Sequence, residues 1–328
     1  MSSVQQSFTC GAWAGRLVDA CEADYGRNVH GYRNGNYYNT HGCTFRQLPQ
    51  DLPWLAPFYS NFELNFNSIP YVCWSAQNWN LALAICATYL ILVFLGIYLM
   101  KQVKPFDLKN SLKFWNIGLS LFSLIGFLRT VPHLIYYIIS DSEGIQHGFY
   151  SSICKPAETS FGQGAAGLWT MLFIFSKVPE LVDTLFVVLR KKELIFLHWY
   201  HHVTVLLYCW HSYMTRSSAG LYFISMNYGV HAIMYFYFAL DKTPLVKFFA
   251  PFVTALQISQ MVVGMIVCAS VYIFRQTSPC DMTPSNFTAG IGMYFSYFLL
   301  FAYFAVEKYI TPTKGGEKKD GKRSKKIE

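Results

Sequence analysis

The sequence predicts an all-α membrane protein with seven transmembrane helices, on the evidence of its composition and its long apolar runs. Hydrophobic residues make up 53% of the 328 residues and charged residues only 13%, about half the charge of an average soluble domain. Apolar stretches close to the ~20 residues that cross a bilayer recur seven times. Because these runs are continuous and do not alternate apolar with polar residues, a transmembrane β-barrel is excluded. The predicted spans are 78–100, 114–139, 164–189, 194–213, 218–240, 249–274 and 289–310.

The basic residues of the short loops predict the orientation of these helices, because positive charge is retained on the cytosolic side of a membrane. They gather after the first, third, fifth and seventh spans, whereas each alternate connection carries a single basic residue. An odd number of spans then places the N-terminal segment, residues 1–76, on the far side of the membrane. Residues 77–311 form the transmembrane domain, and residues 312–328 form a cytosolic tail. The basic residues of the cytosolic loops are Lys101, Lys104, Lys109, Arg190, Lys191, Lys192, Lys242 and Lys247.

The C-terminal tail predicts the membrane in which the protein resides. It is rich in Gly, Lys and Asp, cannot bury apolar surface and is expected to be disordered. It ends Lys325-Lys326-Ile327-Glu328, which resembles the dilysine signal that a receptor reads to return membrane proteins to the endoplasmic reticulum. We therefore expect an endoplasmic reticulum protein with a lumenal N terminus and a cytosolic C terminus. Because the net charge of +8 lies mostly in loop ends and in this tail, it does not indicate binding to nucleic acid.

The cysteines divide between the two compartments, and only those in the oxidising lumen are expected to pair stably. Cys154 and Cys280 lie on two lumenal loops and are expected to form a disulfide, with two free thiols as the alternative. Cys10, Cys21, Cys43 and Cys73 are also lumenal, but four cysteines allow three pairings and the sequence does not choose among them. Asn286 begins a glycosylation sequon at the lumenal start of the seventh span.

Charged residues interrupt the third predicted span. Lys177, Glu180 and Asp183, followed by Thr184, are spaced by three residues and therefore lie near one helical face. Ionisable groups cost a few kcal/mol each within the hydrocarbon region, so they are rare there and indicate function. The alternative is a structural ion network that holds helices together.

The fourth span begins with a histidine box, His198-x-x-His201-His202. Residues i, i+3 and i+4 share one face of a helix, so the three imidazoles point into one space. A single buried histidine is usually a hydrogen-bonded packing residue, whereas three at this spacing indicate a site.

The fifth and sixth spans add further polar stripes. Asn227, His231 and Tyr235 are four residues apart and align an amide, an imidazole and a phenol on one face. Gln257 and Gln260 form a second stripe three residues apart. These neutral groups suit hydrogen bonding to a substrate carbonyl or to an imidazole, and contact between helices is an equally good explanation for the glutamines.

Clustered histidines with carboxylates also raise the question of a metal site. Of the nine histidines, only His198, His201, His202 and His231 lie in the predicted core, and there is no second histidine box. A di-iron centre of the desaturase or hydroxylase kind would lack ligands. A mononuclear zinc site stays open on coordination number alone, but we expect no metal.

These patterns together resemble the ELO family of very-long-chain fatty acid elongases, which are 3-ketoacyl-CoA synthases. The four signature blocks occur in the family's order, one to a helix, and the resemblance extends over residues 106–310. One departure is Phe238, where the family usually has tyrosine. The histidine-box helix and the next one resemble most the branch that acts on saturated and monounsaturated chains. The blocks are Lys177-x-x-Glu180-x-x-Asp183-Thr184, His198-x-x-His201-His202, Asn227 with His231-x-x-Met234-Tyr235, and Thr254-x-x-Gln257-x-x-Gln260.

The resemblance implies an acyltransferase that condenses a long-chain acyl-CoA with malonyl-CoA to give 3-ketoacyl-CoA, carbon dioxide and coenzyme A. It implies an acyl tunnel enclosed by the seven helices and no cofactor. The lipid bilayer and the ketoreductase, dehydratase and enoyl reductase of the elongation cycle are the expected partners, and assembly with a second copy is left open. A desaturase-like metalloenzyme and a non-catalytic lipid transporter are the alternative functions.

The chemistry implied needs a nucleophile, and no cysteine shares the polar face. We expect His201 to carry the acyl group as an acyl-imidazole, oriented by Glu180 or Asp183 within the His198–His202 box. His231 with Asn227 is expected to stabilise the enolate oxygen. Alternatively, His201 acts as a general base without a covalent intermediate. The residues expected to bind substrate are Lys177, Asn227, Tyr235, Gln257 and Gln260.

Overall fold

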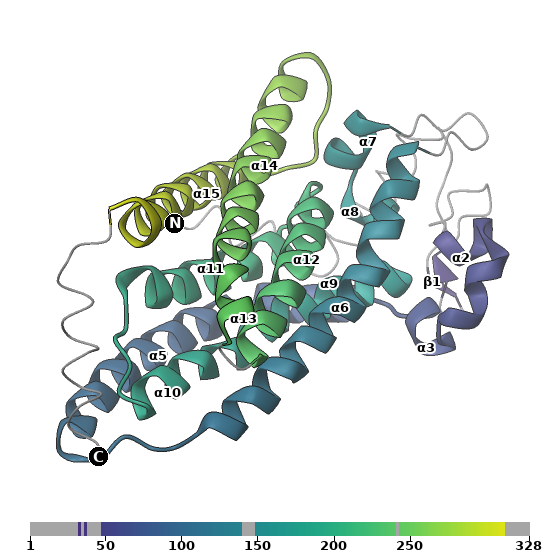
Figure 1. Cartoon of the computed structure of the whole chain (residues 1–328). Coiled ribbons are helices and arrows are strands. Elements are labelled where there is room, and N and C mark those ends of the chain that lie inside the picture. Colours follow the sequence, from purple (N-terminus) through teal and green to yellow (C-terminus); the bar gives the residue numbers. More distant parts are fainter. Residues whose placement is uncertain (1–31, 34–35, 38–46, 140–147, 241–242, 312–328) are drawn as a thin grey trace.

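The computed structural model of the protein describes residues 32–33, 36–37, 47–139, 148–240 and 243–311. The described chain is helical throughout (Figure 1), apart from two-residue strands β1 (Tyr32–Arg33) and β2 (Asn36–Tyr37), which pair antiparallel. The tail with its dilysine sequence and most of the N-terminal segment lie outside the described residues. The all-α class that the sequence predicts is confirmed.

Four long helices form the outer wall of the bundle: α5 (Trp79–Leu99), α6 (Lys109–Ile139), α14 (Ala250–Thr277) and α15 (Pro284–Ala305). Among the described residues, these four, with their short helical extensions, are long and apolar enough to cross a membrane. They leave large apolar side chains exposed, such as Ile91, Phe114, Ile266 and Phe295. Such a surface is stable only against lipid, so the chain is a multi-pass membrane protein.

The remaining predicted spans form the interior of the bundle. They are α9 (Gly164–Ser176) with η3 (Pro179–Leu181) and α10 (Val182–Leu189), then α11 (Phe196–Met214) and α12 (Gly220–Ala239). Ten of the thirteen residues of α9 are buried, compared with four of the twenty-one residues of α5. Helix α11 packs against α5 and α15, and α12 packs against α6 and α14, so each lies between two of the outer helices (Figure 1). These inner helices carry the polar blocks.

The third predicted span, 164–189, is not one continuous helix. It breaks between Ser176 and Pro179, where α9 ends and the 3₁₀ turn η3 begins. Proline has no N–H for the helical ladder, and its ring clashes with the carbonyl four residues earlier. The break therefore falls where Lys177 and Glu180 lie.

Short elements complete the described chain. On the N-terminal side they are α2 (Leu48–Asp51), η1 (Pro53–Phe58), α3 (Asn61–Leu64) and α4 (Ile69–Gln77). The connections contain η2 (Met100–Gln102), α7 (Phe149–Cys154), α8 (Ala157–Ser160), α13 (Pro244–Phe248) and η4 (Val306–Ile310).

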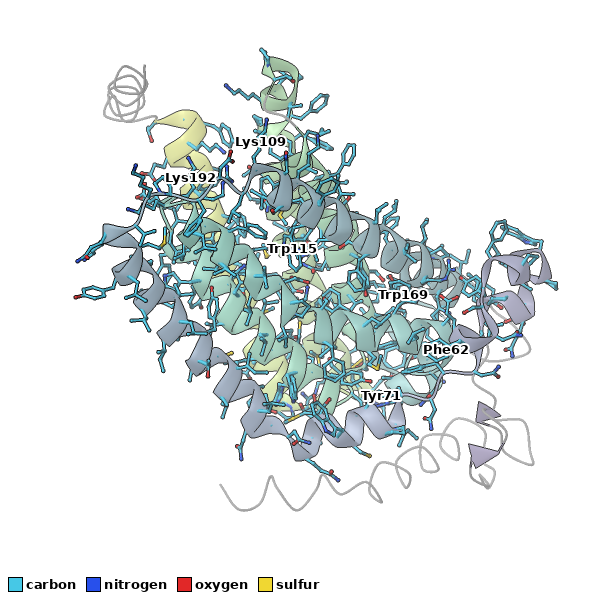
Figure 2. All side chains as sticks on the ribbon, turned by 90° about the horizontal axis from the view of Figure 1, so that it is seen from below. Phe62, Tyr71, Lys109, Trp115, Trp169 and Lys192 are labelled. Carbon is cyan, nitrogen blue, oxygen red and sulfur yellow. A yellow bond between two sulfur atoms is a disulfide. The ribbon has the colours of Figure 1, made fainter. Side chains whose placement is uncertain are left out.

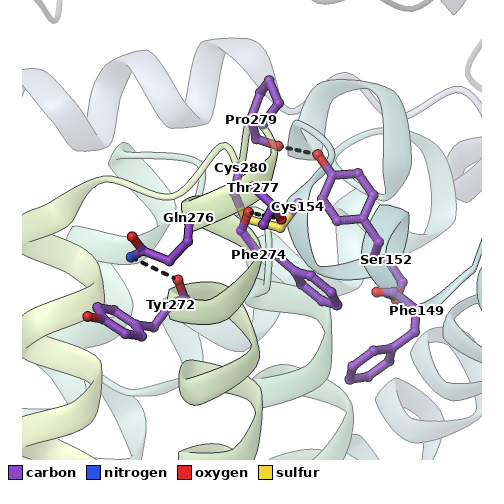
Figure 3. Close-up of a disulfide and its surroundings, with 10 residues drawn as sticks. Phe149, Ser152, Cys154, Tyr272, Phe274, Gln276, Thr277, Pro279 and Cys280 are labelled. Atoms are coloured by element: carbon purple, nitrogen blue, oxygen red, sulfur yellow. Dashed lines mark hydrogen bonds between the residues drawn. A yellow bond between two sulfur atoms is a disulfide. The ribbon is translucent and has the colours of Figure 1, made fainter.

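The predicted disulfide joins Cys154 of α7 to Cys280 after α14 (Figure 3), and it is confirmed with an S–S distance of 2.04 Å. The backbone N–H of Asp281 donates to the carbonyl of Cys154 at 2.9 Å, and the Tyr150 hydroxyl donates to the carbonyl of Pro279. Cys73 is disulfide-bonded as well. The bridge closes a loop of 126 residues, and removing such a crosslink typically costs about 2–5 kcal/mol.

The sequon asparagine, Asn286, has a structural role. Its side chain is fully buried and donates to the Ser212 hydroxyl at 2.7 Å, with His211 Nδ1 at 3.0 Å. A glycan on this amide would require both contacts to break, so the folded chain does not present this asparagine for modification.

Helices α6 and α12 approach each other closely because small residues lie between them. Gly126 of α6 faces the ring of Tyr228, and Gly229 of α12 faces Phe127. The Ser120 hydroxyl donates to the carbonyl of Ala232 at 2.8 Å. Close backbone contact of this kind drives helix association in membranes, where apolar side chains gain little from leaving lipid.

Replacing Gly126 with Ala is expected to destabilise the protein. The added methyl group would lie within 3.0 Å of three ring atoms of Tyr228, whose hydroxyl is held by the carbonyl of Trp169 at 2.8 Å. Overpacking of this kind costs about 1–3 kcal/mol. The thermal unfolding midpoint of purified protein measures the effect, with Gly118→Ala on the same helix as the control because its added methyl meets nothing within 4 Å. Equal midpoints for the two variants would contradict the close packing.

Candidate active site

A buried ion pair lies at the break between α9 and η3. The Lys177 ammonium donates to both carboxylate oxygens of Glu180, at 2.8 and 3.1 Å, and the two residues are only 2% and 3% exposed. The Ser176 hydroxyl donates to the same carboxylate at 2.9 Å. Because buried charges are stable only when paired and hydrogen-bonded, this arrangement fixes the turn as well as the charges.

Lys177 also fixes the orientation of an amide on the neighbouring helix. Its ammonium donates to Asn227 Oδ1 of α12 at 3.3 Å and lies 4.0 Å from the centroid of the Phe173 ring, a cation–π contact. An asparagine whose oxygen accepts from lysine must turn its NH₂ group the other way. The Asn227 amide therefore has its two N–H donors directed away from Lys177.

His231 lies one turn after Asn227 on α12 and approaches the same carboxylate. Its Nδ1 is 4.0 Å from Glu180 Oε2, which is too long for a hydrogen bond but close enough for electrostatic coupling. Its ring packs edge-on against Tyr235, with 5.3 Å between the centroids. The stripe of Asn227, His231 and Tyr235 that the sequence indicates thus faces Lys177 and Glu180.

The histidine box of α11 lies within electrostatic range of this group. The His198 and His202 rings are 4.7 Å apart and the His201 and His202 rings 5.5 Å apart, measured between centroids. His201 interacts electrostatically with His231 and Lys177, and His202 interacts with Glu180 and Lys177. Imidazoles from two helices and the ion pair from a third therefore converge on one site.

In the described chain, the ring of the first histidine of the box has a hydrogen-bond partner that the rings of the other two lack. His198 Nε2 is 2.9 Å from the Thr184 hydroxyl of α10, which is itself 2.8 Å from the Tyr89 hydroxyl of α5. The His201 ring packs against Tyr297 of α15, at 5.1 Å between centroids. His202 is buried and its Nδ1 has no hydrogen-bond partner among the described residues. The Thr184–Tyr89 pair therefore positions His198, and the neighbouring imidazoles keep freer ring nitrogens.

The second carboxylate, Asp183, has different neighbours from Glu180. Its Oδ1 accepts from Trp115 Nε1 of α6 at 2.6 Å, and its Oδ2 accepts from the Tyr235 hydroxyl of α12 at 2.8 Å. Both oxygens are thus engaged by neutral donors. Asp183 links α6, α10 and α12 and fixes Tyr235 against the His231 ring.

The glutamine stripe of α14 lies beside the second histidine block. Gln257 Nε2 is 3.2 Å from the sulfur of Met234, and Gln260 is buried. Thr254 contacts the Tyr309 hydroxyl at 3.2 Å, so part of this stripe joins α14 to the C-terminal turn. Across the part of the chain that the structure describes, no three His, Cys, Asp or Glu side chains are arranged to hold a metal ion.

The sequence does not predict two residues that position site side chains: Tyr89, which holds Thr184 beside His198, and Trp115, which donates to Asp183. Each is a single polar-tipped aromatic residue in an apolar run, of the kind that usually lies at a helix surface. The available signal is a hydroxyl in the otherwise apolar middle of α5, which needs a partner in lipid.

Comparison with known proteins identifies the family. The model of the ELO family, described as GNS1/SUR4, matches residues 74–317, a range that contains every site residue named above. The very long chain fatty acid elongase 6 of Gallus gallus is 39% identical over 262 residues, covering 79% of this chain and 96% of the relative. Its Homo sapiens counterpart is 39% identical over 252 residues, 76% and 92% of the two chains.

A third relative comes from another organism. Fatty acid elongase 3 of Trypanosoma brucei brucei is 38% identical over 277 residues, which cover 78% of this chain and 88% of the relative. The family model matches most of the chain, the four polar blocks occur in order, and the relatives are fatty acid elongases. The chain therefore belongs to the ELO family.

Proposed function

We propose that this protein is a fatty acid elongase that condenses a long-chain acyl-CoA with malonyl-CoA, releasing carbon dioxide and coenzyme A and forming a 3-ketoacyl-CoA two carbons longer. Family membership supports the reaction class. The observation that carries the proposal is the convergence of His201 and His231, from two helices, on the buried Lys177–Glu180 pair. Titratable groups gathered in a dry interior are typical of reacting sites.

In the proposed first step the His201 imidazole attacks the thioester carbonyl of the acyl-CoA. The bond from the carbonyl carbon to sulfur breaks, and the N–H proton of the attacking imidazole goes to the departing thiolate, so coenzyme A leaves as a thiol. The acyl group stays on His201 as an acyl-imidazole, which splits one difficult step into two. Among the described residues the free cysteines are Cys86, Cys209 and Cys268. Cys209, two turns after His201 on α11, is within electrostatic range of Lys177 and Glu180, but in the described chain no hydrogen bond or ring contact joins any of these thiols to the histidines, so the imidazole is the proposed nucleophile.

In the proposed second step malonyl-CoA loses carbon dioxide to give an enolate, whose carbon attacks the acyl-imidazole. The N–H donors of Asn227, directed away from Lys177, and the His231 ring beside Glu180 stabilise the enolate oxygen. The bond to His201 breaks, and the imidazole takes up one proton. Glu180 orients and polarises the histidines, whereas Asp183 acts as a positioning residue through Tyr235.

The proposed placement is the endoplasmic reticulum membrane with seven spans, the three inner segments included, a lumenal N terminus and a cytosolic C terminus. Figure 2 shows Lys109 and Lys192 at one end of the bundle and Phe62 and Tyr71 at the other, which agrees with a basic cytosolic end. Arg190, Lys191 and Lys192 are candidates to meet the phosphates of coenzyme A. No cofactor is required, and the enzymes that reduce and dehydrate the product are the expected partners.

Microsomes containing the chain, given labelled malonyl-CoA and a ladder of acyl-CoA lengths without NADPH, test the proposal. Labelled 3-ketoacyl-CoA is expected to accumulate, because the next enzyme of the cycle cannot reduce it. Microsomes from the same cells without the chain are the control. Absence of label in the product would favour the lipid transporter. An unsaturated product formed from acyl-CoA in a parallel assay supplied with NADH and oxygen would favour a desaturase.

A further inference from the structure

Residues 47–65, formed by α2, η1 and α3, lie outside the part of the chain that the family model matches. They expose three large aromatic side chains, because Trp54 and Phe58 are each 67% exposed and Phe62 is 70% exposed. An aromatic side chain carries about 150–250 Å² of surface, and a segment in water would normally cover most of it. This exposure needs an apolar or interfacial surrounding.

The same residues supply the counter-ion for an arginine inside a predicted span. Arg129 of α6 donates from Nε to Glu63 Oε1 at 2.9 Å and from Nη2 to the carbonyl of Phe58 at 2.6 Å. Its guanidinium also lies 4.5 Å from the centroid of the Tyr59 ring. Glu63 is 8% exposed and accepts from Trp169 Nε1 of α9 at 2.9 Å, so the carboxylate is held from both sides.

The contacts with α6 lie along the flank of the helix, not at its end. Arg129 precedes Ile139, the last residue of α6, by ten positions, or about 15 Å of helix. The Tyr136 hydroxyl donates to Asp51 Oδ2 at 2.7 Å, which attaches the segment again two turns further along. In Figure 1, α2 and α3 accordingly lie beside α6.

The flank of α6 next to these contacts is itself apolar. Ile125 and Leu128, within one turn of Arg129, are 42% and 50% exposed, and Ile135 is 51% exposed. These side chains belong to the lipid-facing surface of a helix that crosses the membrane. The exposed aromatic residues of the segment therefore continue a surface that lipid already covers.

We propose that residues 47–65 are an interfacial element embedded in the lumenal leaflet of the bilayer. Trp54, Phe58 and Phe62 lie within this leaflet beside the lipid-facing flank of α6, where their rings supply apolar surface to the acyl chains and the interfacial region. Glu63 neutralises Arg129 at a depth where an unpaired charge is costly. The ligand of this surface is phospholipid, and the proposal rests on the orientation of the chain, independent of the condensation chemistry.

Site-specific fluorescence in the full chain tests this placement. Single cysteines at positions 54, 58 and 62 carry an environment-sensitive dye in nanodiscs, and Asn61→Cys and Asn65→Cys are the controls, because both residues are exposed and polar in the same segment. The unsubstituted chain, treated with the dye, gives the background. At the aromatic positions we expect strong quenching by spin-labelled lipid and little by iodide, and the reverse at the controls.

Each other pattern overturns the proposal. Quenching by iodide at the three aromatic positions would place the segment in water. Protection from both quenchers would assign the surface to a protein, such as a second copy of the chain, and not to lipid.

Charge removal gives an independent measurement that does not need labels. Glu63→Leu leaves Arg129 unpaired, and the thermal midpoint in nanodiscs is expected to fall. Glu63→Leu combined with Arg129→Leu is expected to recover most of that loss, because two leucines suit lipid. A double variant as unstable as Glu63→Leu alone would contradict a lipid surrounding, since an unpaired arginine in water carries little penalty.

Discussion

Replacing His201 with Ala is expected to abolish formation of the 3-ketoacyl product, by at least about 10³-fold in kcat. The proposed nucleophile is lost, and neither His198 nor His231 is placed to replace it, while the His202 ring is centred 5.5 Å away from that of His201. His198 is held by the Thr184 hydroxyl at 2.9 Å, and His231 lies on another helix beside Glu180. A radiochemical assay of labelled malonyl-CoA incorporation measures the loss.

The control for this variant is Leu207→Val, a substitution on the same helix at a residue that packs towards α5. Both proteins are expected to insert into the membrane and to unfold at similar temperatures, because His201 makes few contacts through its ring nitrogens. Retention of activity by His201→Ala would reduce the histidine to a packing residue and would favour a binding protein over an enzyme.

Replacing Glu180 with Gln is expected to affect both stability and activity. The substitution keeps the shape of the side chain but leaves the Lys177 ammonium buried with no anion, at a typical cost of about 3–5 kcal/mol. It also removes the charge that lies 4.0 Å from His231. The thermal midpoint and the elongation rate are measured on the same preparation.

The double variant Lys177→Met with Glu180→Gln separates the two roles of the pair. Removing both charges is expected to restore most of the stability, since a buried ion pair is often no better than apolar residues of similar volume. Activity is expected to stay low, because Asn227 and His231 lose the groups that orient them. Restored activity in this variant would show that the pair is a purely structural ion network.

Much of the fold could be predicted from hydrophobicity, because the four outer helices must present apolar side chains to lipid along their whole length. The disulfide could be predicted from the compartment expected for its loops, since Cys154 and Cys280 both lie on connections that the distribution of basic residues predicts to be lumenal. The break at Pro179 could not be placed in advance, because a proline in a membrane helix is compatible with a bend as well as an interruption. The structure shows an interruption, because α9 ends at Ser176 and η3 begins at Pro179, and the contacts of Lys177 and Glu180 stabilise it.

The candidate site could be predicted where several polar residues recur at helical spacing, as in the histidine box and in the stripe of Asn227, His231 and Tyr235. Single residues carry no such signal. Arg129 occurs alone in the second span, and its partner Glu63 lies in a segment without clear periodicity. The hydrogen-bond partners of Asp183 could not be predicted either, because Trp115 and Tyr235 lie on other helices.

Release of coenzyme A before the second substrate arrives tests most directly whether His201 is a covalent acyl carrier. Purified enzyme is mixed with acyl-CoA alone, quenched rapidly and assayed for free thiol, with His201→Ala measured in parallel. A burst of about one coenzyme A per enzyme molecule, absent in the variant, is the result expected of an acyl-imidazole. If coenzyme A appears only after malonyl-CoA is added, the covalent role of His201 is wrong.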